Sequence, residues 1–117
     1  MTSKPLDDLA QRLRQFAAIR DWDQFHPPKN LAMALVAEAG ELAAEFQWLT
    51  EAQSRAPGAE QLARIRSESA DVLIYLVRLA DKLGFDLLAA ADAKIEENER
   101  RYPADKVRGS SRKYSEY

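Results

Sequence analysis

Residues 62–83 read LARIRSESADVLIYLVRLADKL, and this stretch decides between a helical and a β-sheet protein. Its centre, VLIYLV at residues 72–77, is short, continuous and apolar, and taken alone it could form a buried strand. However, the apolar positions keep alternating spacings of three and four from Leu62 to Leu83, which is the period of one helix face. Gly84 then provides a helix stop signal. The stretch therefore predicts one long helix.

Three further segments show the same helical period. They cover about residues 6–20, 31–49 and 86–102. Ser3 is expected to cap the first of these helices and Asp86 the last, because their side chains can accept hydrogen bonds from the N–H groups of a first turn. Since the sequence contains no convincing strand pair, these segments predict an all-α fold, a bundle of four to five helices.

The segments between the predicted helices carry loop signals. Residues 21–30 are aromatic and contain two adjacent prolines, and residues 50–60 are polar and contain a Pro-Gly turn signal. A chain of 117 residues is expected to form a single domain, 1–117. Within it, residues 103–117 are predicted to be a polar, partly flexible tail.

The composition excludes several classes of protein. The chain has no Cys, which rules out disulfides, thiolate metal sites and a Cys nucleophile and favours a cytoplasmic location. No apolar run approaches the ~20 residues that a membrane span needs, and the first residues contain no apolar signal region. We therefore expect neither a membrane span nor export. The net charge of −2 gives no reason to expect binding to a nucleic-acid polymer.

The helix predicted at residues 62–83 has a second apolar side. Leu73, Ile74 and Val77 lie away from the main apolar stripe of this helix. Because a small helical protein needs only one buried stripe per helix, a helix that is apolar on several sides indicates a subunit interface. The sequence therefore predicts a homo-oligomer.

The segment ALVAEAGELAAEF at residues 34–46 places carboxylates where apolar side chains are expected. At about 100° per residue, Glu38 falls inside the apolar stripe of its helix, and Glu41 and Glu45 border that stripe. The side of the helix that should face water carries Gly and Ala instead. These carboxylates are therefore predicted to lie at or near the core, where their charge needs compensation.

The helix at residues 62–83 repeats this arrangement. Each of the two helices presents an acidic pair at i, i+3: Glu38 with Glu41, and Glu68 with Asp71. Without compensation, such pairs near a core would be unfavourable or would take up protons. A divalent cation removes the conflict, and carboxylates without His or Cys favour Mg²⁺ first and Mn²⁺ second. A single E-x-x-E is common on ordinary helix surfaces, so the two pairs together support the metal site.

Polar residues near the C-terminus are candidates for binding a polyphosphate. Lys94, Asn98 and Arg101 are spaced four and three, so they share one helix face. Lys and Arg near a metal suit phosphate oxygens. Cations in the C-terminal half of a helix are also favoured by the helix dipole alone, and the pattern leaves both explanations open.

Aromatic residues are candidates for a base-stacking pocket. They are Trp22, Phe25, Trp48 and Tyr75. Trp48 and Tyr75 lie on the same helix sides as acidic residues, which makes them better pocket candidates than Phe25, for which a place in the core is an equal alternative. The lone His26 suits either a nucleotide contact or a plain hydrogen bond within its loop.

Three stretches carry a resemblance to known proteins: RDWDQFHPPKNLAMALVAEAGELAAEFQW, SESADVLIYLVRLADKLGFDL and KIEENERRYPADKVRGSS. Together they resemble the MazG-like all-α nucleoside triphosphate pyrophosphohydrolases, and the similarity extends from about Phe16 to the C-terminus. The family pattern of E-x-x-E, a spacer and E-x-x-D is matched by Glu38, Glu41, Glu68 and Asp71, with 26 residues between the two motifs. Together with W-x-Q-F-H and F-Q-W, the match looks most similar to the dCTP pyrophosphatase branch.

The resemblance implies a helical-bundle enzyme that converts a dNTP, dCTP or a modified dCTP above all, to dNMP and pyrophosphate in clean-up of the nucleotide pool. It implies that the four acidic residues hold Mg²⁺. The phosphate-side pattern K-x-x-x-N-x-x-R is matched by Lys94, Asn98 and Arg101. By motif match, the nucleotide pocket would be lined by Trp22, His26, Trp48 and Tyr75. The family assembles as a dimer, or as a tetramer in this branch, in agreement with the homo-oligomer predicted above.

For the reaction, we expect water to attack the α-phosphorus with pyrophosphate as the leaving group. Catalysis is assigned to Glu38 and Glu41, with Glu41 the first candidate to orient or deprotonate the water. A di-iron or di-manganese carboxylate bundle is disfavoured, because neither acidic pair includes the His of a Glu-x-x-His motif. The remaining alternative is a non-catalytic helical oligomerisation or regulatory module, whose acidic residues pair with Lys94 and Arg101 across subunits.

Overall fold

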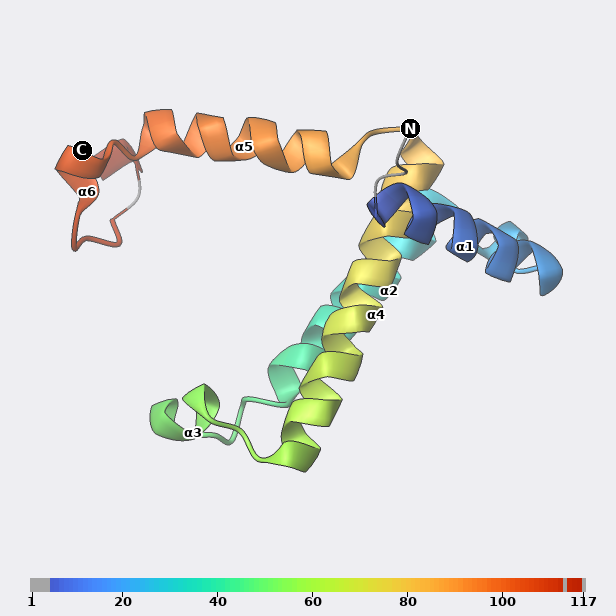
Figure 1. The fold of residues 1–117 in the computed structure, drawn as a ribbon, viewed down its shortest axis with the longest axis horizontal. Coiled ribbons are helices and arrows are strands. Elements are labelled where there is room, and N and C mark those ends of the chain that lie inside the picture. The colour runs from blue at the N-terminus through green and yellow to red at the C-terminus, as the bar shows by residue number, and fades with distance from the viewer. Residues whose placement is uncertain (1–4, 113, 117) are drawn as a thin grey trace. The chain divides into compact units, whose positions relative to one another are not determined.

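A computed structural model of the chain describes residues 5–112 and 114–116, and every regular element in these residues is helical (Figure 1). The four longer helices are α1 Pro5–Ile19, α2 Pro28–Ala44, α4 Ala59–Leu83 and α5 Leu87–Arg101. Shorter elements are α3 Glu51–Arg55, α6 Ala104–Val107 and the 3₁₀ turns η1 Asp23–Phe25 and η2 Tyr114–Glu116. The all-α prediction is confirmed, since the four longer helices correspond to the four predicted segments.

The chain divides into two compact units, Met1–Gly84 and Phe85–Tyr117, which are described separately. In the first unit, α2 runs antiparallel beside α4, and α1 packs across the C-terminal part of α4 (Figure 1). Its centre contains Ala17 of α1, Leu31 of α2, and Val77 and Ala80 of α4. Three helices therefore share one apolar core. The single domain 1–117 stays a prediction.

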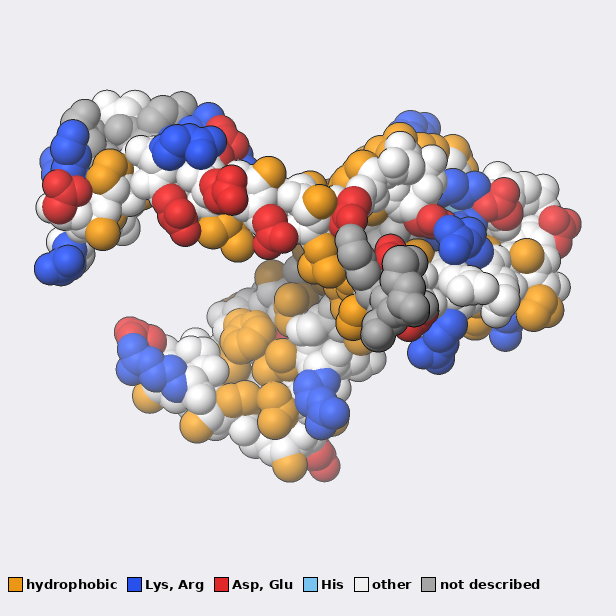
Figure 2. Space-filling view, turned by 45° about the horizontal axis from the view of Figure 1, so that its top comes forward, with side chains coloured by type: hydrophobic (Ala, Val, Ile, Leu, Met, Phe, Trp, Pro, Cys, Tyr) orange, Lys and Arg blue, Asp and Glu red, His pale blue; other side chains and the backbone are white. Residues whose placement is uncertain are grey.

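The second apolar side predicted for α4 is partly used within this unit. Val77 is buried and so is not available to a partner, and Ile74 is half-buried and lines a cavity together with side chains of α1. Leu73 is 42% exposed, and on α2 Met33 and Val36 are 65% and 68% exposed. Figure 2 shows hydrophobic side chains at the surface in the part of the molecule that α2, α3 and α4 form. The α2–α4 pair thus leaves apolar side chains uncovered.

Helix α2 begins earlier and ends earlier than the sequence indicated. It starts at Pro28, where proline is favoured because the first N–H of a helix has no partner within the helix. It ends at Ala44, five residues before the predicted end. There the N–H groups of Glu45 and Phe46 bond three residues back, at 3.2 and 3.0 Å, and so tighten the chain out of the α-helix. Trp48 therefore lies beyond the helix on which its position was projected.

Two short helices lie in segments that were predicted to lack them. Helix α3 falls inside the predicted loop 50–60 and begins with a capping box. Thr50 Oγ1 accepts a hydrogen bond from the Gln53 N–H at 3.2 Å, and Gln53 Oε1 accepts one from the Thr50 N–H at 2.9 Å. Helix α6 lies in the predicted tail. The expected cap Ser3 lies outside the described residues.

Helix ends around the junction of the two units follow the sequence signals. Gly84 ends α4 with a φ of 75°, a left-handed conformation that glycine adopts without steric cost. Asp86 caps α5, because its Oδ1 accepts a hydrogen bond from the Ala89 N–H at 3.0 Å. Both signals were predicted and are confirmed. Within the part of the chain that the structure describes, every helix is too short or too polar to cross a bilayer.

The end of α1 is a left-handed turn that places Trp22. Asp21 has a φ of 55°, the Asp21 N–H bonds to the Ala18 oxygen at 3.1 Å, and the Trp22 N–H bonds to the Ala17 oxygen at 2.8 Å. These two bonds form a Schellman motif, in which the residue after the left-handed one usually contacts the last turn of the helix. Accordingly, the Trp22 and Phe16 rings form a T-shaped pair with 5.7 Å between their centroids.

Exchange of Asp21 for Val is expected to lower the free energy of unfolding by about 1 kcal/mol, because a β-branched residue is strained in the left-handed region. Asp21→Asn should be close to wild type, since Asn tolerates this conformation. Thermal unfolding followed by circular dichroism measures both variants. An Asp21→Val protein as stable as Asp21→Asn would contradict the role assigned to this turn.

Candidate active site

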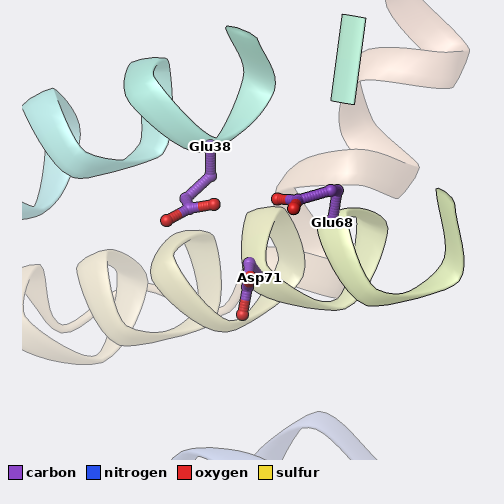
Figure 3. Close-up of side chains that lie close together, drawn as sticks. All are labelled: Glu38, Glu68 and Asp71. Atoms are coloured by element: carbon purple, nitrogen blue, oxygen red, sulfur yellow. The ribbon is translucent and has the colours of Figure 1, made fainter. Parts of the chain in front are cut away.

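Three half-buried carboxylates meet between α2 and α4, and we call them the carboxylate triad: Glu38, Glu68 and Asp71. Each offers one oxygen, and these oxygens all lie within 4.8 Å of one another. Figure 3 shows Glu38 projecting from α2 toward Glu68 on the facing helix, with Asp71 one turn farther along α4. Residues from two acidic motifs that are distant in sequence are thus brought together.

Glu68 lies in unfavourable surroundings for a carboxylate. Its Oε2 atom is buried, and in the described part of the chain it finds no hydrogen-bond partner. Burial raises the pKa of Glu68, and the neighbouring carboxylates of Glu38, Glu41 and Asp71 raise it further. A buried, ionised oxygen without a donor is unfavourable unless a proton or cation accompanies it. A donor set of carboxylate oxygens alone therefore fits a hard divalent cation.

The two remaining carboxylates of the 34–46 segment lie outside the triad. Glu41 is exposed and sits one turn farther along α2 than Glu38, although its charge still acts on the triad. Glu45 Oε1 accepts a hydrogen bond from Arg64 Nε at 2.9 Å, and the Glu45 backbone oxygen accepts one from Gln61 Nε2 at 2.7 Å. Glu45 thus fastens the end of α2 to the first turns of α4.

A cavity of about 320 Å³ opens beside the triad, and we call it the aromatic cavity. It is lined by Leu13, Phe16, Trp22, His26, Leu31, Asp71, Ile74, Tyr75 and Arg78. Asp71 belongs both to this lining and to the triad. The cavity therefore places ring side chains and one carboxylate of the triad, Asp71, in the same lining.

A second cavity of about 280 Å³ shares part of this lining. Its residues are Trp22, Phe25, His26, Asn30, Leu31, Ala34 and Tyr75. Three of the predicted pocket residues, Trp22, His26 and Tyr75, thus line both cavities. Phe25, for which a core position was the alternative, is 59% exposed and lines the second.

His26 is placed by the turn that leads into α2. Its N–H donates to the Asp23 oxygen at 3.0 Å and closes η1. Asn30 Nδ2 donates to the Phe25 oxygen at 3.2 Å, which ties the turn to the first turn of α2. Burial lowers the pKa of His26, and the nearby charge of Arg78 lowers it further. Both effects favour the neutral form of the imidazole.

Of the other predicted binding residues, Trp48 lies in the first unit and is not among the residues that line these two cavities. Trp48 follows the end of α2 and is 87% exposed, so the helical projection that set it on the side of Glu41 does not apply to it. Lys94, Asn98 and Arg101 lie on α5, in the second unit.

On α5, two of the predicted cations are organised by one carboxylate. Lys94 Nζ lies 3.2 Å from Glu97 Oε2, and Arg101 Nη2 lies 2.7 Å from Glu97 Oε1. The hydrogen bond from Lys94 and the charge of Arg101 hold the pKa of Glu97 below its usual value. Glu97 thereby keeps the two cations near each other on the helix face that Asn98 also borders.

Sequence reasoning missed Arg78, which lines the aromatic cavity and is 5% exposed. A signal for it was present, because Asp71, Tyr75 and Arg78 are spaced four and three and so share one face of α4. A charged residue that continues the face of a predicted ligand and a predicted pocket residue is a candidate for the same site.

Exchange of Glu68 for Gln is expected to stabilise the cation-free protein and to remove most of its stabilisation by a divalent cation. Gln carries no charge, and its amide can donate a hydrogen bond to Glu38, so the repulsion within the triad falls. Thermal unfolding at neutral pH, with EDTA and then with excess Mg²⁺, measures both effects.

The matched control is Glu60→Gln, an exposed carboxylate in the first turn of the same helix, which should respond to Mg²⁺ as the wild type does. A wild-type protein that gains no stability from Mg²⁺, or a Glu68→Gln protein that gains as much as the wild type, would remove the cation from the triad.

The chain is similar to known proteins in both sequence and structure. Residues 33–117 match the MazG-like family. The sequence is 49% identical to "dCTP pyrophosphatase 1" of Homo sapiens and 46% identical to that of Mus musculus, in each case over 113 residues and 95% of this chain. The chain spans 66% of the length of these relatives. The crystal structure of a pyrophosphatase from Archaeoglobus fulgidus is similar, with a TM-score of 0.80 and 36% identity over 88% of this chain and 96% of that chain. The chain belongs to the MazG-like family.

Proposed function

We propose that the chain is a divalent-cation-dependent nucleoside triphosphate pyrophosphohydrolase. It would convert a dNTP, with dCTP or a modified dCTP as the first candidate, to dNMP and pyrophosphate. The observation that carries the proposal is the position of Asp71, which belongs both to the carboxylate triad and to the lining of the aromatic cavity. A nucleotide needs this adjacency, because its base is a flat ring and its phosphates are charged. The names of the relatives support the choice of dCTP.

The two sides of the site suit the two ends of a nucleotide. Trp22 and Tyr75 offer ring faces on which a base can stack. A divalent cation held by the triad, Mg²⁺ first and Mn²⁺ as a substitute, would offset the negative charge of the triphosphate oxygens. Because Asp71 lies at the boundary between the two sides, the phosphate nearest the sugar would lie at the triad.

Glu41 is proposed to orient or deprotonate the attacking water. Of the two roles expected for Glu41, metal ligand and base, its exposed position outside the triad favours the base. Glu41 lies one turn from Glu38. As a member of the triad, Glu38 also acts at the reacting centre. The proton of the water passes to the Glu41 carboxylate, the new P–O bond forms at the α-phosphorus, and pyrophosphate leaves.

We also assign roles to the other residues that the sequence predicted to bind the nucleotide. On the strength of the family motifs, Trp48 is assigned to the nucleotide pocket and Lys94, Asn98 and Arg101 to the phosphates. Support for the phosphate role is the pairing of two of these cations through Glu97, which keeps their charges together on α5.

The purified chain with Mg²⁺ is expected to release dNMP and pyrophosphate, and not inorganic phosphate, from dCTP. In ¹⁸O-labelled water the label should appear in dCMP, because the water attacks the α-phosphorus. Mass spectrometry of both products, repeated with the other dNTPs and with modified dCTPs, measures the reaction and its preference.

Glu38→Gln and Asp71→Asn should each lower kcat at least about a hundredfold while the helical content is unchanged, since loss even of supporting groups at metal sites costs ten- to a hundredfold. Glu60→Gln serves as the matched control. Turnover close to wild type in either triad variant, or label in pyrophosphate, would refute the mechanism. A protein that releases no pyrophosphate from any nucleotide and gains no stability from Mg²⁺ would instead be a non-catalytic helical module.

We also propose that the chain assembles as a homo-oligomer, a dimer or a tetramer, through the α2–α4 pair. The support is the exposure of Met33, Val36 and Leu73 on these two helices. Leu73→Asp is expected to produce a smaller species in light scattering coupled to size exclusion. Ile19→Asp is the control, because Ile19 is 81% exposed but lies at the end of α1. Equal sizes of the Leu73→Asp and wild-type proteins would place the interface elsewhere.

A further inference from the structure

Arg78 of α4 is a buried guanidinium that contacts the turn carrying His26. Its Nη2 lies 2.7 Å from Asp23 Oδ1, and its Nη1 lies 3.5 Å from Asp81 Oδ2. Its Nε donates a long hydrogen bond of 3.4 Å to His26 Nδ1. The Arg78 side chain is 6% exposed, so these contacts replace most of its hydration.

The carboxylates around Arg78 do not need this guanidinium for charge balance. Asp81 already pairs with Arg14 at 2.6 Å, and Asp23 already pairs with Lys82 at 2.5 Å. Three cations thus share two carboxylates in this group. A buried ion pair is in general weak support for stability, because the loss of hydration offsets much of the attraction. What Arg78 adds, and what neither Arg14 nor Lys82 is seen to make, is the hydrogen bond to His26.

The direction of that hydrogen bond fixes the state of the imidazole. Arginine only donates and stays charged, so Nδ1 of His26 must accept and cannot carry a hydrogen. The ring hydrogen is then on Nε2. The charged groups around His26 are Arg78 and Lys82 of α4 and Asp23 of η1, while Asp71 and Tyr75 share its cavity. Burial and the charge of Arg78 lower the pKa of His26, which favours the same neutral form.

We propose that Arg78 is a positioning residue that holds His26 at the aromatic cavity as a neutral imidazole with its hydrogen on Nε2, so that His26 donates a hydrogen bond to an acceptor atom of the bound nucleotide. This inference rests on the proposed function for the identity of the ligand. The arrangement of Arg78 and His26 can be tested without any nucleotide.

The proposal has a chemical consequence for what the cavity accepts. A neutral Nε2–H donor recognises an acceptor, such as a ring carbonyl or an unprotonated ring nitrogen of a base, or a phosphate oxygen. It adds no charge to the cavity, and it rejects a donor at the same place, because two facing N–H groups would both lose their partners. His26 would therefore contribute to selection among nucleotides and not merely to affinity.

The first experiment observes His26 directly by ¹⁵N NMR of the full chain in the absence of nucleotide. The chain contains a single His, so the imidazole signals need no further assignment. We expect the Nε2–H form in the wild type and a pKa below the ordinary value of 6.5. Arg78→Met should shift the tautomer balance and raise the pKa of His26, whereas Arg14→Met, which removes the other arginine from Asp81, should do neither.

A wild-type protein with the hydrogen on Nδ1 would overturn the proposal, as would an Arg78→Met protein whose imidazole signals and pKa match those of the wild type. If Arg78→Met does not fold, Arg78→Lys replaces it, because Lys keeps the charge but cannot reproduce the fixed fork of donors. The wild-type measurement decides the tautomer in either case.

The second experiment is a double-mutant cycle on the hydrolysis of dCTP with Mg²⁺. Arg78→Met is expected to raise KM roughly fivefold, the size of one hydrogen bond, with little change in kcat. In a His26→Ala background, Arg78→Met should raise KM no further, because Arg78 acts through His26. An equal increase in both backgrounds would mean that Arg78 acts on the fold and not through His26. A protein without hydrolysis but with the expected NMR signals would reject the proposed function alone.

Discussion

The close approach of Glu38, Glu68 and Asp71 between α2 and α4 is the constraint on which the rest of the site depends. Three like charges at this separation oppose the packing of the helices that carry them. The helices nevertheless stay together because Ala17, Leu31, Val77 and Ala80 bury apolar surface beside them. The unit therefore holds an unfavourable charge arrangement that a cation would relieve.

Helix α4 orders the functional groups along a single axis. Asp71, Tyr75 and Arg78 follow one another on one face of an uninterrupted helix of 25 residues. With a rise of 1.5 Å per residue, Asp71 and Arg78 are separated by about 10 Å along the axis. Along this face lie a carboxylate of the triad, then an aromatic ring, then the guanidinium that donates a hydrogen bond to His26. A rigid helix keeps this order more accurately than separate loops could.

Local sequence patterns predicted much of this arrangement. They failed where the position of a residue depends on long-range contacts or on where a helix ends. The sequence predicted a set of four carboxylates, and three of them form the triad while Glu41 is exposed. The prediction was possible because the angle between residues of one helix is a local property, so the inner edge of each helix can be derived separately. Helix α2 was predicted to run on to Leu49, past Trp48, because nothing in the apolar period marks its end at Ala44. Arg78 was missed because its partners Asp23 and His26 lie more than fifty residues away in sequence. The roles of Lys94, Asn98 and Arg101 stay predictions.

The two halves of the site are prepared in opposite ways. The turn that carries Trp22 and His26 is fixed at both ends, by the left-handed Asp21 after α1 and by the prolines that open α2, and Arg78 holds its middle against α4. Little conformational entropy would then be lost if a base entered, which would favour binding. The triad side is instead kept under electrostatic repulsion. Under the proposed function, binding at the ordered half would position the phosphates, and relief of the repulsion at the other half would add a driving force that an isolated base could not supply, so the site as a whole would favour a triphosphate with its cation over a nucleoside.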